Sequence, residues 1–213
     1  MRACLVMSFA GLIATPAMAG SWSPKPYVKP NIGVSIYGAG GSTSTAIGLG
    51  AQGGFKYFNE EDPPVPLGGR TRVSGTYLFS TDGGSGHDVR LGSFMGPSFK
   101  LASAELGLDV FNNGYSAGLA SIPNTTGIDI PLNATLGPDV VYVLGGVTPA
   151  VLFNPARQVD WSTVDAFGFG HEFEWRLGVQ LNIPVMSIGL TYSKRFMAPN
   201  IINQGFMLGV SVG

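Results

Sequence analysis

The sequence predicts an all-β protein in which about ten antiparallel strands, with eight also possible, close into an up-and-down transmembrane β-barrel. Three observations predict this fold. Charged residues make up 12% of the 213-residue chain and hydrophobic residues 45%, whereas a soluble globular domain carries about 25% charged residues. Glycine is frequent, at 32 residues. Apolar and polar residues alternate over long segments, and beyond the N-terminus no run of about 18 apolar residues is available for a helical membrane span.

The N-terminus has the features of a secretory signal peptide. Arg2 precedes an apolar run over residues 3–13, and small residues follow up to Ala19. This order of a positive residue, an apolar segment and a small-residue cleavage site predicts a signal peptide over residues 1–19. Its removal would take away Cys4, the one cysteine of the sequence, so we expect no disulfide in the mature chain.

The mature chain is predicted to begin with an extended periplasmic leader over residues 20–30, which contains three prolines, and to continue as a β-barrel over residues 31–213. The clearest strand lies within residues 167–183, where odd positions are almost all apolar and even positions are charged, amide or glycine residues. Only a β-strand converts this period of two into two faces. At about 3.3 Å per residue, such a strand crosses a hydrocarbon core of about 30 Å at a tilt of roughly 45°.

Similar alternation recurs along the rest of the chain. The segment over residues 140–153 is apolar on both faces and contains Pro149, so the alternation leaves its register open. In chain order, the ten candidate strands cover residues 32–40, 47–57, 72–80, 89–101, 104–110, 128–136, 140–153, 167–183, 186–196 and 206–212.

The expected connections alternate between short turns and longer segments rich in Gly, Asn, Asp and Pro. This alternation is typical of outer-membrane barrels, which have short periplasmic turns and longer external loops. It predicts that both termini lie in the periplasm and that external loops lie near residues 81–87, 114–126 and 154–165.

A closed barrel in lipid also explains the composition. No amphipathic helix is available to cover an apolar sheet face, whereas lipid covers it and closure pairs every strand edge. In these features residues 31–213 resemble the small outer-membrane β-barrel proteins of Gram-negative bacteria, in the broad sense of the opacity-protein and OmpA-like membrane barrels. The resemblance implies a location in the outer membrane, contact with outer-membrane lipid and lipopolysaccharide, and assembly by the barrel-assembly machinery.

The positions predicted to face the lumen carry six basic and five acidic residues. The first hypothesis is that these charges form ion pairs that fill a narrow interior. The alternative is a small porin-like channel in which they line the pore and set its ion selectivity. The eleven residues are Lys56, Arg72, Arg90, Lys100, Glu105, Asp109, Asp129, Glu172, Glu174, Arg176 and Arg195.

The sequence gives little support to other functional classes. His87-Asp88 and His171-Glu172 are the candidate catalytic groups of an outer-membrane hydrolase, but no serine has a lipase-like spacing to either histidine and no Gly-x-Ser-x-Gly motif occurs. We therefore expect no enzyme activity, no catalytic residue, no metal site and no cofactor. The net charge of −1 argues against nucleic acid as a partner.

Two functional roles follow from the barrel prediction. A structural or surface-interaction role with a charge-filled lumen is the first hypothesis, and a channel for ions or small solutes is the alternative. A secreted, soluble β-sandwich that serves as a binding module is less favoured, because its outer surface would require many more charged residues.

Overall fold

The computed structural model describes residues 22–39, 42–59, 66–117, 120–138, 140–153, 170–198 and 201–212. The predicted signal peptide over residues 1–19 and the expected loop near 154–165 lie outside them. No helix in this part of the chain is long and apolar enough to cross a membrane. The strands are β1 (Trp22–Ala39), β2 (Ser42–Asn59), β3 (Leu67–Ser80), β4 (Gly84–Phe99), β5 (Ala102–Ala117), β6 (Ala120–Asp129), β7 (Leu132–Leu136), β8 (Val141–Leu152), β9 (Gly170–Ile183), β10 (Met186–Ala198) and β11 (Ile201–Val212).

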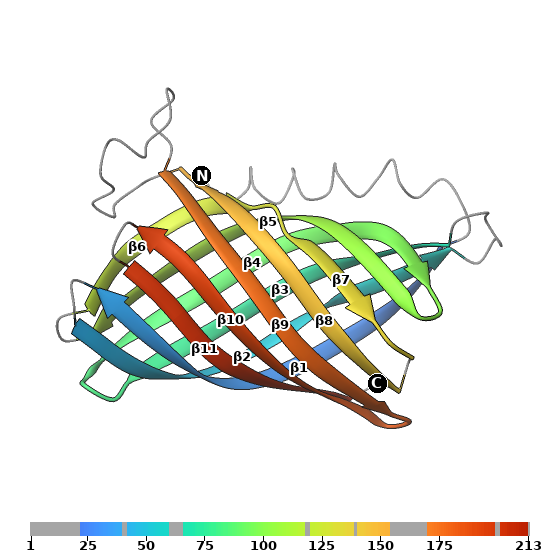
Figure 1. The fold of residues 1–213 in the computed structure, drawn as a ribbon, viewed down its shortest axis with the longest axis horizontal. Helices are drawn as coiled ribbons and strands as arrows, with labels where there is room; N and C mark the ends of the chain where they lie inside the picture. Colours follow the sequence, from blue (N-terminus) through green and yellow to red (C-terminus); the bar gives the residue numbers. More distant parts are fainter. Residues whose placement is uncertain are drawn as a thin grey trace.

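The strands form a closed antiparallel barrel (Figure 1). Each strand pairs with its neighbours in the chain, and β1 pairs with β11 to complete the circle. β6 and β7 together form one strand of the barrel. Both pair with β5 and with β8, and the register of each pairing continues unchanged from β6 to β7. The ladder is interrupted only at Ile130 and Pro131, and proline has no backbone N–H to donate. The prediction of an antiparallel barrel with about ten strands is therefore confirmed.

β1 begins earlier than the sequence predicts. Trp22 pairs with Asn59 of β2, and the pairing continues without a break through the residues predicted to form a leader. Between Val28 and Asn31, the ladder to β11 has a gap that contains Pro30. Pro24, Pro26 and Pro30 occupy even-numbered positions, so their backbone nitrogens point to the same side of β1. On the β11 side, the ladder begins only at Val28 and is interrupted at Pro30. Proline is tolerated where a strand has no ladder hydrogen bond to donate.

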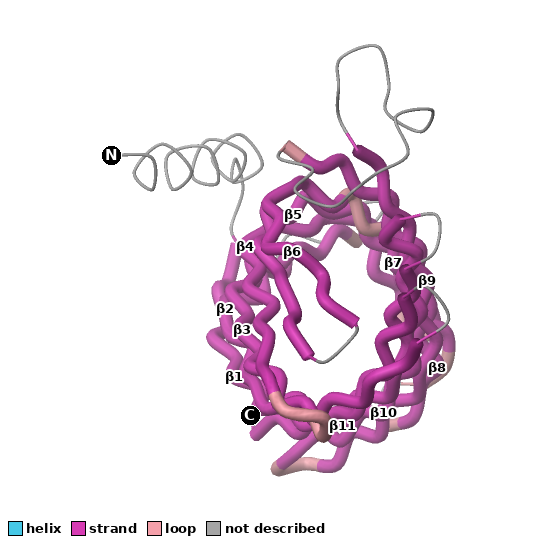
Figure 2. The backbone as a smooth tube through the Cα atoms, turned by 90° about the vertical axis from the view of Figure 1, so that its left-hand side faces the viewer, coloured by secondary structure: helices cyan, strands magenta, loops and turns pink. Residues whose placement is uncertain are grey.

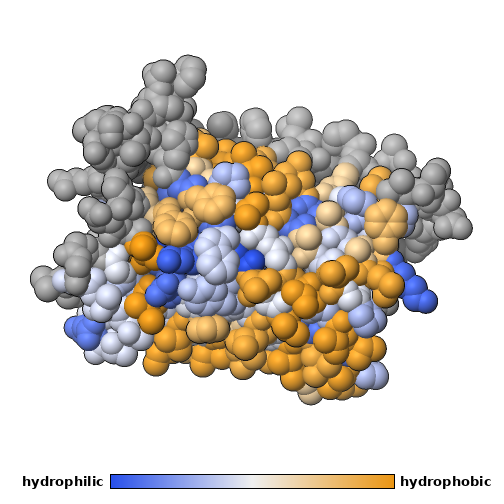
Figure 3. Space-filling model, in the orientation of Figure 1, coloured by the Kyte–Doolittle hydropathy of each residue, from blue (hydrophilic) through white to orange (hydrophobic). Residues whose placement is uncertain are grey.

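The outer surface is apolar, as the alternation of the sequence predicts. Alternate large apolar side chains on every long strand are exposed, whereas the residues between them point into the barrel. Figure 3 shows apolar side chains along much of one outer face. Examples from different strands are Val34, Leu49, Val73, Val89, Leu106, Val143, Leu177, Leu190 and Leu208.

The barrel has two different ends. The terminal end is the one at which β1 begins and β11 finishes, with the β4–β5 and β9–β10 turns. The opposite end carries the connections β1–β2, β3–β4, β5–β6, β8–β9 and β10–β11, and we call it the plugged end. Figure 2 views the barrel from the plugged end and shows the β5–β6 hairpin lying inside its outline.

The expected loop over residues 114–126 is therefore wrong. Most of these residues continue β5 and β6 as a hairpin, which contacts β1 and β2 across the lumen. The expected loop over residues 81–87 is also shorter, because β4 already begins at Gly84.

Candidate functional site: the barrel lumen

The plugged end of the lumen is filled by apolar side chains from six strands. We call this group the plug; its best-anchored member is Tyr115 of the β5–β6 hairpin. The Tyr115 ring stacks on that of Tyr37 in β1, with centroids 4.0 Å apart. Its hydroxyl lies 2.9 Å from Ser44 Oγ in β2, in a hydrogen bond that either group can donate. The plug consists of Tyr37, Ala46, Leu78, Tyr115, Ile122 and Met197, all less than 6% exposed.

A bulge directs the hairpin into the lumen. The register between β5 and β6 shifts between Asn113 and Tyr115, which leaves one more residue on β6 than on β5. Such a bulge bends a strand pair. Gly114 lies at the shift, where a Cβ atom would come within 3.0 Å of Asn124 Cα. A glycine thus allows the two chains of the hairpin to approach closely at the bend.

On the side of the plug that faces the terminal end lies a layer of ion pairs. Arg195 of β10 contacts three carboxylates: its Nε donates to Glu172 at 2.7 Å, and its terminal nitrogens contact Asp129 at 3.1 Å and Glu174 at 3.3 Å. Arg90 of β4 also contacts Asp129, at 2.9 Å. We call this group the ion-pair layer; its members are Asp88, Arg90, Asp129, Glu172, Glu174 and Arg195.

Four of the six residues of the ion-pair layer are buried, and the layer crosslinks several strands. Asp129 has no exposed surface, and it receives hydrogen bonds from both guanidinium groups. The Arg195 guanidinium also lies 4.6 Å from the centre of the Phe111 ring. Charge-assisted hydrogen bonds at low dielectric are strong when every charge has a partner. The layer therefore ties β4, β6, β9 and β10 together through the interior.

A second group of arginines lies closer to the terminal end. Arg72 forms a buried ion pair with Asp109, and Arg70 forms an ion pair with Glu105 in which both Nε and a terminal nitrogen donate, at 3.1 and 2.9 Å. The ring of Phe94 lies against both guanidinium groups, with centroid distances of 4.1 Å to Arg70 and 4.9 Å to Arg72. A further arginine, Arg176 of β9, donates to Asn133 Oδ1 in β7.

A cavity of about 570 Å³ occupies the remaining lumen. Tyr115 and Met197 of the plug border it on one side, while Lys100 and Gly137 border it in turns at the terminal end. Most of its cationic lining belongs to the terminal half. The lumen thus combines a filled plugged end with an open, basic terminal half.

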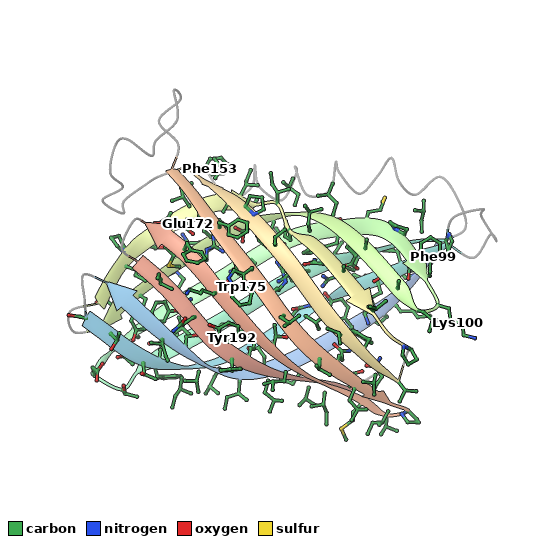
Figure 4. The ribbon with its side chains drawn as sticks, in the orientation of Figure 1. Phe99, Lys100, Phe153, Glu172, Trp175 and Tyr192 are labelled. Atoms are coloured by element: carbon green, nitrogen blue, oxygen red, sulfur yellow. The ribbon has the colours of Figure 1, made fainter. Side chains whose placement is uncertain are left out.

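The structure places the eleven residues predicted to face the lumen in two kinds of position. Ten are strand residues that line the cavity or form the ion pairs described above. The other, Lys100, lies exposed in the β4–β5 turn, where Figure 4 labels it beside Phe99. Lys100 borders the cavity at its rim, and among the described residues no carboxylate pairs with it.

The sequence does not predict three of the charged residues that line the lumen. Lys29 lies in the segment predicted as a leader, Arg70 lies two residues before the predicted start of its strand, and Asp88 lies one residue before the predicted start of its own. Arg70 and Asp88 have the same parity as Arg72 and Arg90, the predicted lumen positions on their strands, and Lys29 has the parity of Asn31, which also lines the cavity. Extending the alternation past the expected strand ends is the signal that would have found them.

On the outer surface, aromatic side chains gather on the last three strands. Trp175, Tyr192 and Phe206 form a continuous cluster, with ring centroids 5.3 and 5.0 Å apart for successive pairs. Figure 4 labels Trp175 and Tyr192 on neighbouring strands. By contrast, Tyr142 of β8 lines the cavity.

The candidate catalytic groups His87 and Asp88 form hydrogen bonds with neighbouring side chains. His87 Nε2 lies 2.7 Å from Asn112 Oδ1, and Asp88 accepts hydrogen bonds from Arg90. The side chain of His171 lies outside the described residues. Within the described ranges, no three His, Cys, Asp or Glu side chains are grouped to hold a metal ion.

No protein-family model and no curated protein sequence matches the chain. Several solved structures are similar in fold. Neisserial surface protein A has 12% identity and a TM-score of 0.44, with 89% of this chain and 98% of that chain covered. The β domain of the Bordetella autotransporter BrkA has 11% identity and a TM-score of 0.48, with the same coverage. Ail of Yersinia pestis, solved with a heparin analogue, has 13% identity and a TM-score of 0.30, covering 89% and 98%.

The pairing of the strands and the distribution of apolar and charged side chains indicate where the protein is located. The pairing of β1 with β11 closes the sheet, so both of its edges are paired along the barrel wall from Val28 to Ala39, as a bilayer requires. Most large apolar side chains face outward, where a water-soluble protein would carry charges, and most charged side chains of the strands face inward. An apolar belt around a polar interior is the arrangement of barrels in the outer membrane of Gram-negative bacteria. The chain is therefore an outer-membrane β-barrel protein.

Proposed function

We propose that the barrel is sealed against solute passage and serves a structural or surface-interaction role at the outer membrane. The observation that carries this proposal is the position of Tyr115, which the β5–β6 hairpin brings across the lumen onto Tyr37 and Ser44. A loop that merely covered the mouth would leave a path beside it. Here the hairpin is anchored to the opposite wall by a ring stack and a hydrogen bond.

The ion-pair layer supports the same proposal. Opening a path through it would separate Arg195 from three carboxylates, of which Asp129 and Glu172 are almost fully buried. Separating buried charges from their partners costs several kcal/mol. In this proposal the apolar belt contacts outer-membrane lipid and lipopolysaccharide, and the functional surfaces are those outside the lumen.

The second candidate is a narrow channel for ions or small solutes. The observation that favours it is the cavity, which reaches the terminal end and has charged residues along its wall. Conduction would require the hairpin to leave the plug, since Tyr115 and Ile122 are each 3% exposed.

Planar-bilayer recording of the refolded protein distinguishes the two. We expect no steady conductance from the native chain. The double variant Tyr115→Ala/Ile122→Ala, which removes two plug side chains, is expected to give current steps. Tyr77→Ala is the matched control, because Tyr77 is an aromatic residue on the outer face of β3.

Steady, ion-selective steps from the native chain would contradict the sealed barrel. Such steps would establish the channel if Arg176→Ala or Glu174→Ala changed their selectivity, since both residues line the cavity. If neither the native chain nor the double variant gave current steps, Tyr115 and Ile122 would not be the residues that seal the barrel. That result would contradict the proposed role of the hairpin.

A further inference from the structure

We propose that the terminal half of the lumen is a binding site for a small oxyanion, a solute that carries phosphate or carboxylate groups. This inference goes beyond the proposed function, because it concerns the half of the lumen that the plug does not fill. It requires neither an open nor a sealed plugged end.

The first argument is the balance of charge. Five cationic side chains line this half, namely Lys29, Lys56, Arg70, Arg72 and Arg176. Two carboxylates, Glu105 and Asp109, neutralise two of them through the ion pairs with Arg70 and Arg72. For the other three, no carboxylate within the described residues lies at ion-pair distance. The site thus holds a surplus of positive charge inside a low-dielectric wall.

The second argument is that like charges face one another across the sheet. Lys56 of β2 is the direct cross-strand partner of Arg70 in β3 and of Lys25 in β1. Like charges directly opposite destabilise a sheet. Glu105 neutralises Arg70 of this row, and an anion bound beside Lys56 would offset positive charge that remains.

The unpaired cations interact only with neutral groups in the described part of the chain. Lys29 Nζ lies 3.4 Å from Gln180 Oε1, and Lys56 Nζ lies 5.6 Å from the centre of the Tyr27 ring. Arg176 donates to the amide oxygen of Asn133. Long hydrogen bonds and ring contacts of this kind leave donor capacity on both ammonium groups for a ligand.

Buried donors without acceptors are the third argument. Arg72 Nε and Asn133 Nδ2 are buried and have no hydrogen-bond partner among the described residues. Both side chains line the cavity, and Arg72 is only 6% exposed. Burying a donor without an acceptor is costly. Asn31 Oδ1, also in the wall and unpaired, could accept from a hydroxyl group on the ligand.

Two glycines, Gly189 of β10 and Gly209 of β11, leave room for the Lys29 side chain. A Cβ atom at either Gly189 or Gly209 would lie 3.2 Å from Lys29 Nζ, and at Gly209 it would also overlap the Lys29 side chain. These two residues are direct cross-strand partners. Their missing side chains create the space through which the Lys29 ammonium reaches the lumen.

The size and access of the cavity suit a metabolite-sized anion. Its volume of about 570 Å³ falls in the usual range of about 300–1,000 Å³ for small-molecule sites. Ser98, Lys100 and Gly137 border it near the terminal end, so a solute can enter there. The exposed Lys100 adds a further positive charge at this rim.

Calorimetric titration of the full chain refolded in a non-ionic detergent tests the proposal. Inorganic phosphate and citrate are the two probes, and glucose is the neutral control. We expect saturable binding of phosphate, citrate or both, weakened by added salt. The double variant Lys29→Gln/Lys56→Gln should weaken binding at least tenfold. Gly209→Ala, which displaces Lys29 without changing any charge, should weaken it as well.

The matched control is Lys194→Gln, because Lys194 is outside the lumen lining and lies 5.2 Å from the centre of the Phe196 ring. It should bind the anion like the native chain. A circular dichroism spectrum and a heat-modifiability gel establish that each variant is folded. The absence of saturable binding of both probes, equal binding by the folded double variant, or equal weakening by Lys194→Gln would overturn the proposal. The titration is independent of the conductance recordings, so the two proposals can fail separately.

Discussion

Tyr115 of β5 stacks on Tyr37 of β1 across the lumen, with ring centroids 4.0 Å apart and planes 12° from parallel. The two strands are not neighbours in the barrel. The stack therefore joins the inward hairpin to the far wall, and Ser44 completes the anchor by bonding to the Tyr115 hydroxyl and to Asp82.

The hydroxyl and the ring of Tyr115 should contribute separately to stability. We expect Tyr115→Phe to lower the free energy of unfolding by about 1 kcal/mol, the usual value of one hydrogen bond. Tyr115→Ala should lower it by about 3–5 kcal/mol, since it also leaves a cavity in the plug. Urea unfolding in detergent micelles, followed by circular dichroism, measures both. Tyr77→Phe, on the outer surface, is the control, and an equal loss there would argue against a special role for the plug.

The direction of lumen side chains could be predicted because it is a local property. A pleated strand turns successive residues to opposite faces, so Glu172, Glu174 and Arg176 had to share one face once their segment was identified as a strand. The apolar residues between them then had to face lipid. Strand number followed from counting such segments.

The inward hairpin and the ion-pair partners could not be predicted in the same way. The hairpin depends on a one-residue bulge in β6 opposite Gly114 and on a receiving site formed by β1 and β2. The pairing of Arg195 with Asp129 depends on which residues come to the same height across the lumen, and this is set by the stagger of all the strands. Neither relationship appears in the local sequence.

A side chain at Gly86 should displace the hairpin. A Cβ atom there would lie 2.6 Å from the carbonyl oxygen of Gly114 and 2.9 Å from the Tyr115 ring. We expect Gly86→Val to cost about 1–3 kcal/mol, as overpacking does, and to produce current steps in planar bilayers. Gly75→Val is the control, because nothing lies within 4 Å of a Cβ atom at Gly75. Identical stability and baseline current in the two variants would show that the hairpin adapts to the added bulk.

Adjacent residues of β10 offer a matched test of the ion-pair layer. Arg195 points inward to three carboxylates, and Lys194 lies outside the lumen lining. We expect Arg195→Ala to lower the free energy of unfolding by about 3–5 kcal/mol, because it removes the guanidinium group that three buried carboxylates share. Lys194→Ala should change it by less than about 0.5 kcal/mol, as is usual for a surface substitution. Similar losses in the two variants would mean that the layer contributes little net stability.

The orientation of the barrel can be tested with single cysteines. Cys4 is the one cysteine of the sequence and lies in the predicted signal peptide, so the mature chain is expected to give no background. Ser85 is exposed beside the β3–β4 turn at the plugged end, and Val185 is exposed in the β9–β10 turn at the terminal end. We expect a membrane-impermeant maleimide to label Ser85→Cys in intact cells and Val185→Cys only after the outer membrane is permeabilised. The reason is that tight hairpin turns and both termini of such barrels remain in the periplasm. The reverse labelling pattern would place the basic cavity on the external face, where its anion would come from the surroundings of the cell.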